Sequence, residues 1–200
     1  MIRSQLGLSE TRRARFHPAP AWSLALPVLV VLVAVAVASL LVLSNSGTKT
    51  ASVDPGVAQV GKRAPGFSSW DLAGKKVSLD EFKGKPVLLT FWATWCTACQ
   101  EELPALQQID QQYGSSGLTV LAIDYRETDT ARMSRFLAGL HVDMESVVDP
   151  QGAIAGAFGV DLGLPVNVWL DRNHVISRVM VGAQPASALD AAAAQVAAST

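Results

Sequence analysis

Two cysteines, Cys96 and Cys99, are the only cysteines in the 200-residue chain, and Thr97 and Ala98 separate them. On a helix, this spacing brings the two sulfurs within one turn. An oxidised pair then closes a small disulfide ring. A reduced pair can attack another disulfide and resolve the mixed disulfide without a large backbone movement. The spacing therefore predicts dithiol–disulfide exchange.

A strand and a helix must position this pair. Residues 86–93 form a β-rich apolar run, typical of a strand buried on both faces, and residues 97–112 repeat apolar side chains at helical spacing. The first cysteine then stands at a helix N-terminus, where unpaired N–H groups and the helix dipole lower the pKa of a thiol from about 8.5 toward 7 or below. We predict that Cys96 is the nucleophile and Cys99, one turn inside the helix, the resolving thiol.

Two other uses of the cysteine pair are weaker. A zinc site needs further ligands, but no other cysteine exists, and His141 and His174 stand in unrelated parts of the sequence. A purely structural disulfide across three residues constrains little of the unfolded chain. We therefore favour redox chemistry and expect no metal and no cofactor.

The pattern beyond the cysteines predicts an α/β fold. Strands are expected at residues 118–124, 166–170 and 175–181, and helices at 129–140, 151–158 and 186–198. The last two strands form a hairpin through residues 171–174. Alternating strands and helices followed by a hairpin imply a mixed central sheet with helices on both faces.

Composition and charge exclude several classes of function. The chain is 50% hydrophobic and carries a formal net charge of -1. A general nucleic-acid binder needs a large basic surplus, so we expect no nucleic-acid partner. The apolar content also excludes a disordered chain, and the length fits one globular domain.

The N-terminal region predicts a membrane anchor. Residues 21–43 carry no charge, and a helix of that length spans roughly 34 Å against a hydrocarbon core of about 30 Å. The arginines before it are expected to keep residues 1–20 in the cytoplasm as a basic tail. They are Arg3, Arg12, Arg13 and Arg15. Residues 44–60 are interpreted as a flexible linker, and residues 61–200 as an extracytoplasmic domain held at the cell membrane.

Two other fates of this segment stay open. Ala36-Val37-Ala38 has the form of a signal-peptidase site, although cleavage there would leave an apolar N-terminus. The pair Arg12-Arg13 raises the twin-arginine export route, but Phe16 lies one position too late for the usual pattern. The uncharged run exceeds the length of a usual signal sequence, which favours an uncleaved anchor.

Residues 91–104, FWATWCTACQEELP, resemble the active-site segment of membrane-anchored thioredoxin-like proteins of the TlpA/ResA/CcmG (DsbE) type, in the redoxin/AhpC-TSA-related superfamily. Residues 61–67, 79–88 and 163–171 resemble further segments of the same family. The resemblance implies a thioredoxin fold, an extracytoplasmic location and thiol–disulfide exchange.

The resemblance also implies roles for four further residues. Glu102 falls at the family's buried acidic position, one turn below Cys99, where a carboxylate can accept the proton that this thiol loses. Pro165 matches the family's cis-proline, which lies opposite the dithiol and leaves Leu164 free to pair with an extended substrate. Trp95 is expected at the surface as a contact for partners.

Function and partners follow from the same resemblance. We expect a tethered disulfide reductase that acts on extracytoplasmic protein thiols or disulfides, with apocytochrome c as a client in cytochrome c maturation, and that is recharged by a membrane thiol–disulfide electron donor. An oxidant that introduces disulfides and a non-catalytic redox-sensing module remain alternatives. Peroxidase chemistry is disfavoured, because Leu89 and Ala93 stand where peroxiredoxins place proline and threonine.

One departure from the family pattern concerns the direction of exchange. Common members place a proline before the second cysteine, where this chain has Ala98. We expect the Ala98 N–H, which proline lacks, to donate a hydrogen bond to the Cys96 thiolate and make the protein more oxidising.

Overall fold

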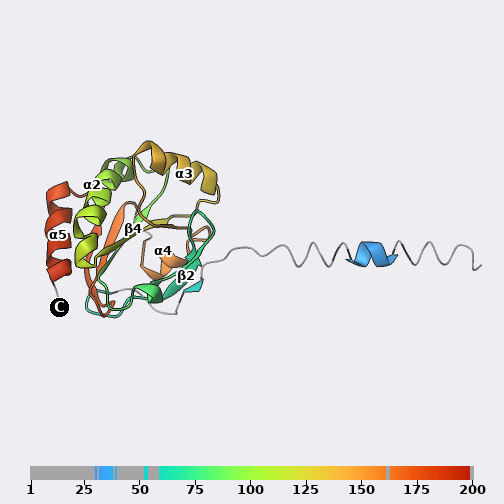
Figure 1. The fold of residues 1–200 in the computed structure, drawn as a ribbon, viewed down its shortest axis with the longest axis horizontal. Coiled ribbons are helices and arrows are strands. Elements are labelled where there is room, and N and C mark those ends of the chain that lie inside the picture. Colours follow the sequence, from blue (N-terminus) through green and yellow to red (C-terminus); the bar gives the residue numbers. More distant parts are fainter. Residues whose placement is uncertain are drawn as a thin grey trace, which may run out of the picture. The chain divides into compact units, whose positions relative to one another are not determined.

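The computed structural model describes residues 30, 32–37, 39, 52–53, 59–160 and 163–198 (Figure 1). The chain divides into two compact units, Met1–Thr48 and Lys49–Thr200. In the first unit, residues 30, 32–37 and 39 are helical. No helix within the described ranges is both long and apolar enough to cross a membrane. Most of the anchor predicted at residues 21–43 lies outside those ranges, as do residues 1–20 and most of the linker at 44–60.

The second unit is built on a five-stranded mixed sheet with the order β6-β5-β4-β7-β8. Its strands are β4 (Val87–Trp92), β5 (Thr119–Asp124), β6 (Ser146–Val147), β7 (Val166–Leu170) and β8 (Ile176–Val181). Strand β4 pairs in parallel with β5 and antiparallel with β7, and β7 and β8 form the predicted hairpin. The mixed α/β sheet expected from the sequence is confirmed.

Helices cover the two faces of this sheet. The helices are α2 (Thr97–Tyr113), α3 (Thr130–Gly139), α4 (Ala153–Ala157) and α5 (Ala186–Ala198). Side chains alternate along a strand, so Leu88 and Trp92 of β4 pack into a core with α2, α3 and α5, whereas Leu89 and Phe91 pack with α4 on the opposite face. Helices on both faces were predicted and are confirmed.

A second sheet precedes β4 in the chain, in a region to which the sequence analysis assigned no elements. It has three antiparallel strands, β1 (Ser52–Val53), β2 (Phe67–Trp70) and β3 (Lys76–Ser78), and a 3-10 helix η1 (Leu79–Phe82) follows. Ser78 and Glu81 form a capping box at the start of η1. Phe67, Val77 and Leu79 bury their side chains in the α4 core, which ties this region to the sheet.

Helix α2 comes after the central strand β4 in the chain. Its apolar positions recur every three or four residues, so they line one face of the helix, which packs in the core. Its buried residues are Cys99, Glu102, Leu103, Leu106, Gln107 and Ile109. The apolar members of this stripe match the predicted face. The remaining buried members are a glutamate and a glutamine, and Gln107 accepts the backbone N–H groups of Asp143 and Met144 through its side-chain oxygen. The glutamate belongs to the site described next.

Candidate dithiol active site

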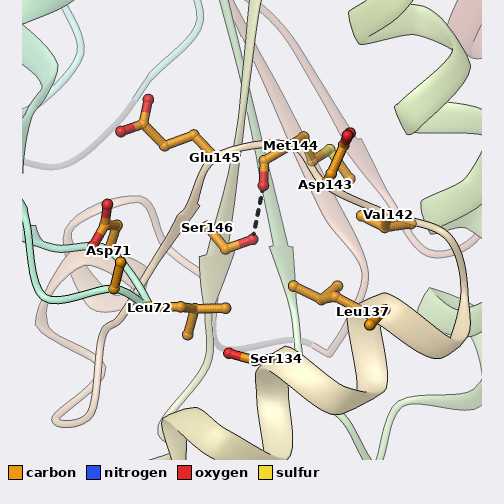
Figure 2. A pocket seen from close by; sticks show the side chains of 11 residues that line it. Asp71, Leu72, Ser134, Leu137, Val142, Asp143, Met144, Glu145 and Ser146 are labelled. Carbon is orange, nitrogen blue, oxygen red and sulfur yellow. Dashed lines mark hydrogen bonds between the residues drawn. The ribbon is translucent and has the colours of Figure 1, made fainter.

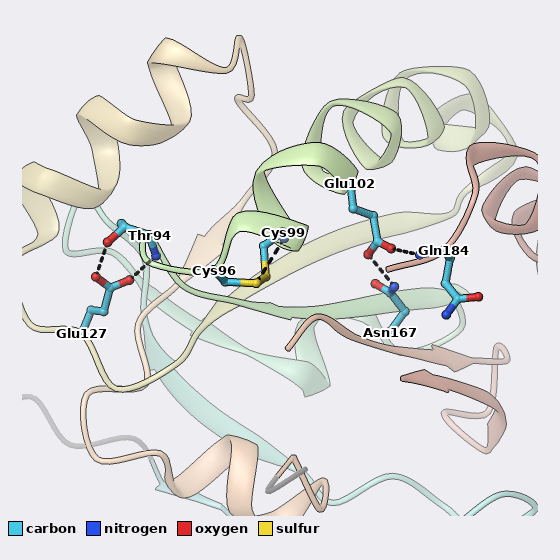
Figure 3. Close-up of a disulfide and its surroundings, with 7 residues drawn as sticks. All are labelled: Thr94, Cys96, Cys99, Glu102, Glu127, Asn167 and Gln184. Carbon is cyan, nitrogen blue, oxygen red and sulfur yellow. Dashed lines mark hydrogen bonds between the residues drawn. A yellow bond between two sulfur atoms is a disulfide. The ribbon is translucent and has the colours of Figure 1, made fainter. Parts of the chain in front are cut away.

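The two cysteines lie where β4 ends and α2 begins (Figure 3). Strand β4 is buried along its whole length at the centre of the sheet, so it fixes the point at which the chain emerges. Cys96 is the N-cap of α2, and Cys99 lies in the first turn. They form a disulfide with a Cα–Cα distance of 5.2 Å. Cys96 is 6% exposed and Cys99 is 0% exposed, so only the first sulfur lies near the surface.

A backbone N–H of the helix points at the first sulfur. The Cys99 N–H donates to Cys96 Sγ at 3.1 Å. An N-cap side chain accepts from the second or third helical residue, and Cys99 is the third. In the disulfide form the donor to Cys96 is therefore the Cys99 N–H, and the bond expected from the Ala98 N–H to the Cys96 thiolate stays a prediction.

Glu102 lies under the helix, one turn beyond Cys99, and is 3% exposed (Figure 3). Its Oε1 accepts from Asn167 Nδ2 at 2.7 Å, and its Oε2 accepts from the Gln184 N–H at 2.7 Å. Burial raises the pKa of Glu102, while the two hydrogen bonds act in the opposite direction. A carboxyl group with a raised pKa beneath a thiol can exchange a proton with it, which is the role predicted for Glu102.

The predicted substrate edge adjoins the dithiol in the sheet. The Leu164–Pro165 peptide bond is cis, and Phe91 of β4 pairs with Val166 of β7 directly after it. Pro165 therefore leads into the strand next to the one that ends at the cysteines. Its carbonyl accepts from the Gly182 N–H at 2.8 Å.

Trp95, the other predicted contact residue, is 60% exposed next to Cys96. Its ring meets Tyr125 edge-on, with the ring centroids 6.5 Å apart. Trp92, by contrast, is fully buried and stacks on Phe136, as expected of a core residue. An exposed aromatic ring therefore stands next to Cys96 in the chain. The contact role of Trp95 stays a prediction.

The structure adds a group of polar residues that the sequence analysis did not identify. The Glu127 carboxylate accepts the Thr94 N–H at 2.6 Å and the Thr94 hydroxyl at 2.5 Å (Figure 3). The Glu127 N–H donates to Asp124 Oδ2 at 3.1 Å. Thr94 lies two residues before Cys96, so this group fixes the loop that carries Cys96. Asp124 is buried at the end of β5, and burial raises its pKa to about 7. Its position at the end of an apolar strand was the available signal, and its hydrogen-bond donor, the Glu127 N–H, lies three residues further on in the following loop.

A pocket of about 300 Å³ lies apart from these residues (Figure 2). Leu72, Leu137 and Val142 form part of its apolar lining, and Asp143 and Glu145 lie among its acidic residues. None of the predicted site residues lines it. The pocket is therefore separate from the dithiol and its supporting groups.

Known proteins share this sequence pattern and this fold. The sequence profile of the Redoxin family matches residues 59–196. The thiol-disulfide oxidoreductase ResA of Bacillus thuringiensis subsp. konkukian is 34% identical over 132 residues, which cover 66% of this chain and 75% of the relative. The thioredoxin-like protein YneN of Bacillus subtilis is 34% identical over 126 residues, covering 62% of this chain and 72% of the relative.

A solved structure agrees with these relatives. A Chlorobium tepidum protein named as a thiol:disulfide interchange protein DsbE superposes with a TM-score of 0.65 at 30% identity, covering 70% of this chain and 99% of the other. The thioredoxin-like fold, the cysteine pair at the helix N-terminus and the named activity of these proteins all agree. The chain is a thiol–disulfide oxidoreductase and belongs to the redoxin family of thioredoxin-like proteins.

Proposed function

We propose that the protein acts outside the cytoplasm as a disulfide reductant, with Cys96 as the nucleophile and Cys99 as the resolving thiol. The observation that carries the proposal is the asymmetry of the pair, in which Cys96 is 6% exposed and Cys99, one helical turn before Glu102, is 0% exposed. The Cys96 thiolate attacks a partner disulfide and releases one partner thiol. Cys99 then displaces the other partner thiol and leaves the Cys96–Cys99 disulfide.

The surroundings of the dithiol favour the reducing direction. Strong oxidants of this fold stabilise their reduced thiolate, which makes the disulfide form easy to reduce. Here the hydrogen bond found at Cys96 Sγ is a single backbone N–H, and the nearby acid Glu102 opposes a second negative charge when it is ionised. The N–H bond stabilises a Cys96 thiolate, but the ionised carboxylate of Glu102 acts against it, and we propose that this repulsion keeps the reduction potential low.

The test of direction is the equilibrium potential of the full-length protein against glutathione. A value below about -220 mV supports a reductant, and a value near -120 mV would overturn it in favour of an oxidant. Insulin reduction in the presence of dithiothreitol then separates an enzyme from a passive module. Wild-type activity that is lost in Cys96→Ser supports catalysis, whereas an inert wild type contradicts it.

The location is the second part of the proposal. A helix over residues 21–43 tethers the protein to the cell membrane, with residues 1–20 in the cytoplasm and the dithiol outside. The support is the uncharged length of that segment and the four arginines before it. The proposed partners are the cysteine pair of apocytochrome c and a membrane thiol–disulfide electron donor, which rest on the resemblance to the ResA and CcmG type.

A labelling experiment tests this topology. In the Cys99→Ser variant, Cys96 is the sole thiol, and a membrane-impermeant maleimide should label it in intact spheroplasts. The control is Ser4→Cys in a variant without Cys96 and Cys99, which should be labelled only after lysis. Protection of Cys96 until lysis would refute an extracytoplasmic dithiol.

A further inference from the structure

Asn167 is an unusual residue for its position. It lies in β7, a strand whose residues are all buried, and its neighbours Val166 and Val168 are apolar. It is 0% exposed and pairs in register with Thr90 of the central strand. Burying an amide costs free energy unless it forms hydrogen bonds. An apolar side chain at this position would therefore cost less free energy to bury, and the presence of an amide needs an explanation.

The hydrogen bond found for this amide is to Glu102. Asn167 Nδ2 donates to Oε1 at 2.7 Å, across 65 positions of sequence, and the Gln184 N–H donates to Oε2 (Figure 3). Within the described part of the chain, Asn167 Oδ1 has no hydrogen-bond partner. The amide is therefore not held as part of a wider network. Its donor end serves the carboxylate that lies one turn beyond the resolving thiol.

An amide suits a carboxyl group that must change its protonation state. A lysine or arginine at this place would hold Glu102 permanently ionised, and an apolar residue would let burial keep it protonated. A neutral amide donates to the carboxylate through Nδ2. After a flip it can accept from the protonated acid through the unpaired Oδ1, because an amide carries both a donor and an acceptor.

We propose that Asn167 is a positioning residue that orients Glu102 and keeps it ionised until Cys99 gives up its proton. This inference rests on the proposed role of Glu102 in exchange. In the step, the Cys99 S–H proton passes to Glu102, and the Cys99 thiolate attacks Cys96 in the mixed disulfide. The Cys96–Cys99 bond forms, the bond from Cys96 to the partner sulfur breaks, and the partner leaves as a thiolate. The dithiol loses two electrons and the partner disulfide gains them.

The groups that face Glu102 are few. Strand β7 contributes the Asn167 amide and the segment between β8 and α5 contributes the Gln184 N–H, while Cys99 precedes Glu102 by three residues on α2. No charged side chain of the described residues accounts for the pKa of Glu102, which reflects burial and these two hydrogen bonds. Changing Asn167 should therefore act directly on the titration of Glu102.

The first test uses Asn167→Leu in the full-length protein. Two quantities are followed against pH: the carbon-13 shift of the Glu102 carboxyl carbon and the rate of insulin reduction. Loss of the donor should move the Glu102 midpoint to higher pH and lower the rate at pH 7 by about tenfold, equivalent to roughly 1.4 kcal/mol. The rate should recover as the pH rises.

A matched control separates this effect from a loss of stability. Ser69 is also buried, and its hydroxyl donates to the Val148 carbonyl at 2.6 Å, away from Glu102. Ser69→Ala should lower stability and leave the Glu102 midpoint and the rate profile unmoved. If Asn167→Leu does not fold, Asn167→Ser removes the amide with a smaller change, and the same two readouts apply.

A double variant decides whether Asn167 acts through Glu102. In a Glu102→Gln background, Asn167→Leu should cause no further loss of rate. Effects that multiply, or a rate lowered equally at every pH with an unmoved Glu102 midpoint, would overturn the inference. An inert wild type would instead contradict the proposed function, and the carboxyl titration would still show whether Asn167 controls Glu102.

Discussion

Asp124 should make the protein less stable as the pH rises through neutrality. Its carboxyl group is 1% exposed, and burial raises its pKa to about 7 in the folded protein, with the charges of Glu127 and Asp149 adding to the rise. An aspartate in an unfolded chain titrates near 3.9. Between these values the folded protein holds a proton that the unfolded chain has lost, so the stabilising effect is fully present below about pH 4 and disappears by about pH 7.

The magnitude follows from the gap between the two pKa values. One pKa unit is worth about 1.4 kcal/mol, so the full effect is roughly 4 kcal/mol, and about 3 kcal/mol of it develops between pH 5 and pH 8. Asp124→Asn removes the titration and keeps the acceptor for the Glu127 N–H. The free energy of unfolding of the variant, relative to wild type, should therefore increase by roughly 3 kcal/mol between these two pH values.

The assay is urea denaturation of the full-length proteins with the disulfide intact, followed by circular dichroism at pH 5 and pH 8. Asp143→Asn serves as the control for the loss of an acidic side chain, because Asp143 is exposed and does not belong to the group around Asp124. An Asp124→Asn difference that is equal at pH 5 and pH 8 would mean that Asp124 is already ionised in the folded protein at pH 5. The reasoning from burial would then be wrong.

Three further predictions concern the dithiol and the loop that precedes it. Glu102→Gln should slow insulin reduction at pH 7 by about a hundredfold, because it removes the proton acceptor. Glu101→Gln, the control, should match wild type. Equal rates for the two variants would exclude a proton transfer by Glu102. Ala98→Pro should shift the potential against glutathione by less than about 30 mV, since the observed donor to the first sulfur is a different N–H, and a larger shift would restore Ala98 as the relevant donor. Thr94→Val should lower the free energy of unfolding by about 1 kcal/mol, because the hydroxyl bond to Glu127 is lost, and unchanged urea denaturation would show that this bond does not stabilise the fold.

Sequence periodicity and spacing predicted the elements that carry the cysteines. The apolar run before Cys96 became the buried strand β4, and the helical spacing of Cys99, Leu103 and Leu106 became the buried face of α2. These signals are local, so a few consecutive residues suffice to reveal them. The exposure of Trp95 and the burial of Trp92 also agree with the prediction, because each follows from the position of its residue relative to the end of the strand.

The remaining features depend on contacts between distant residues. Asn167 and Glu102 are 65 positions apart, and nothing in either segment indicates that their side chains meet. The same holds for Thr94 and Glu127, which come from loops after different strands. Strand β6 has only two residues, too few to show a period. The donor to Cys96 in the disulfide form could not be predicted either, because the sequence does not show which N–H of a first turn points at the N-cap.

The unequal burial of the two cysteines fixes which sulfur can form the mixed disulfide with a partner. In the proposed exchange a partner chain is joined to Cys96, which is 6% exposed, and not to Cys99, which is 0% exposed. Every partner is then attached through Cys96 Sγ and released when the buried Cys99 attacks that sulfur. In a Cys99→Ser variant the mixed disulfide with Cys96 cannot be resolved. The proteins that accumulate in that mixed disulfide should therefore be the natural substrates.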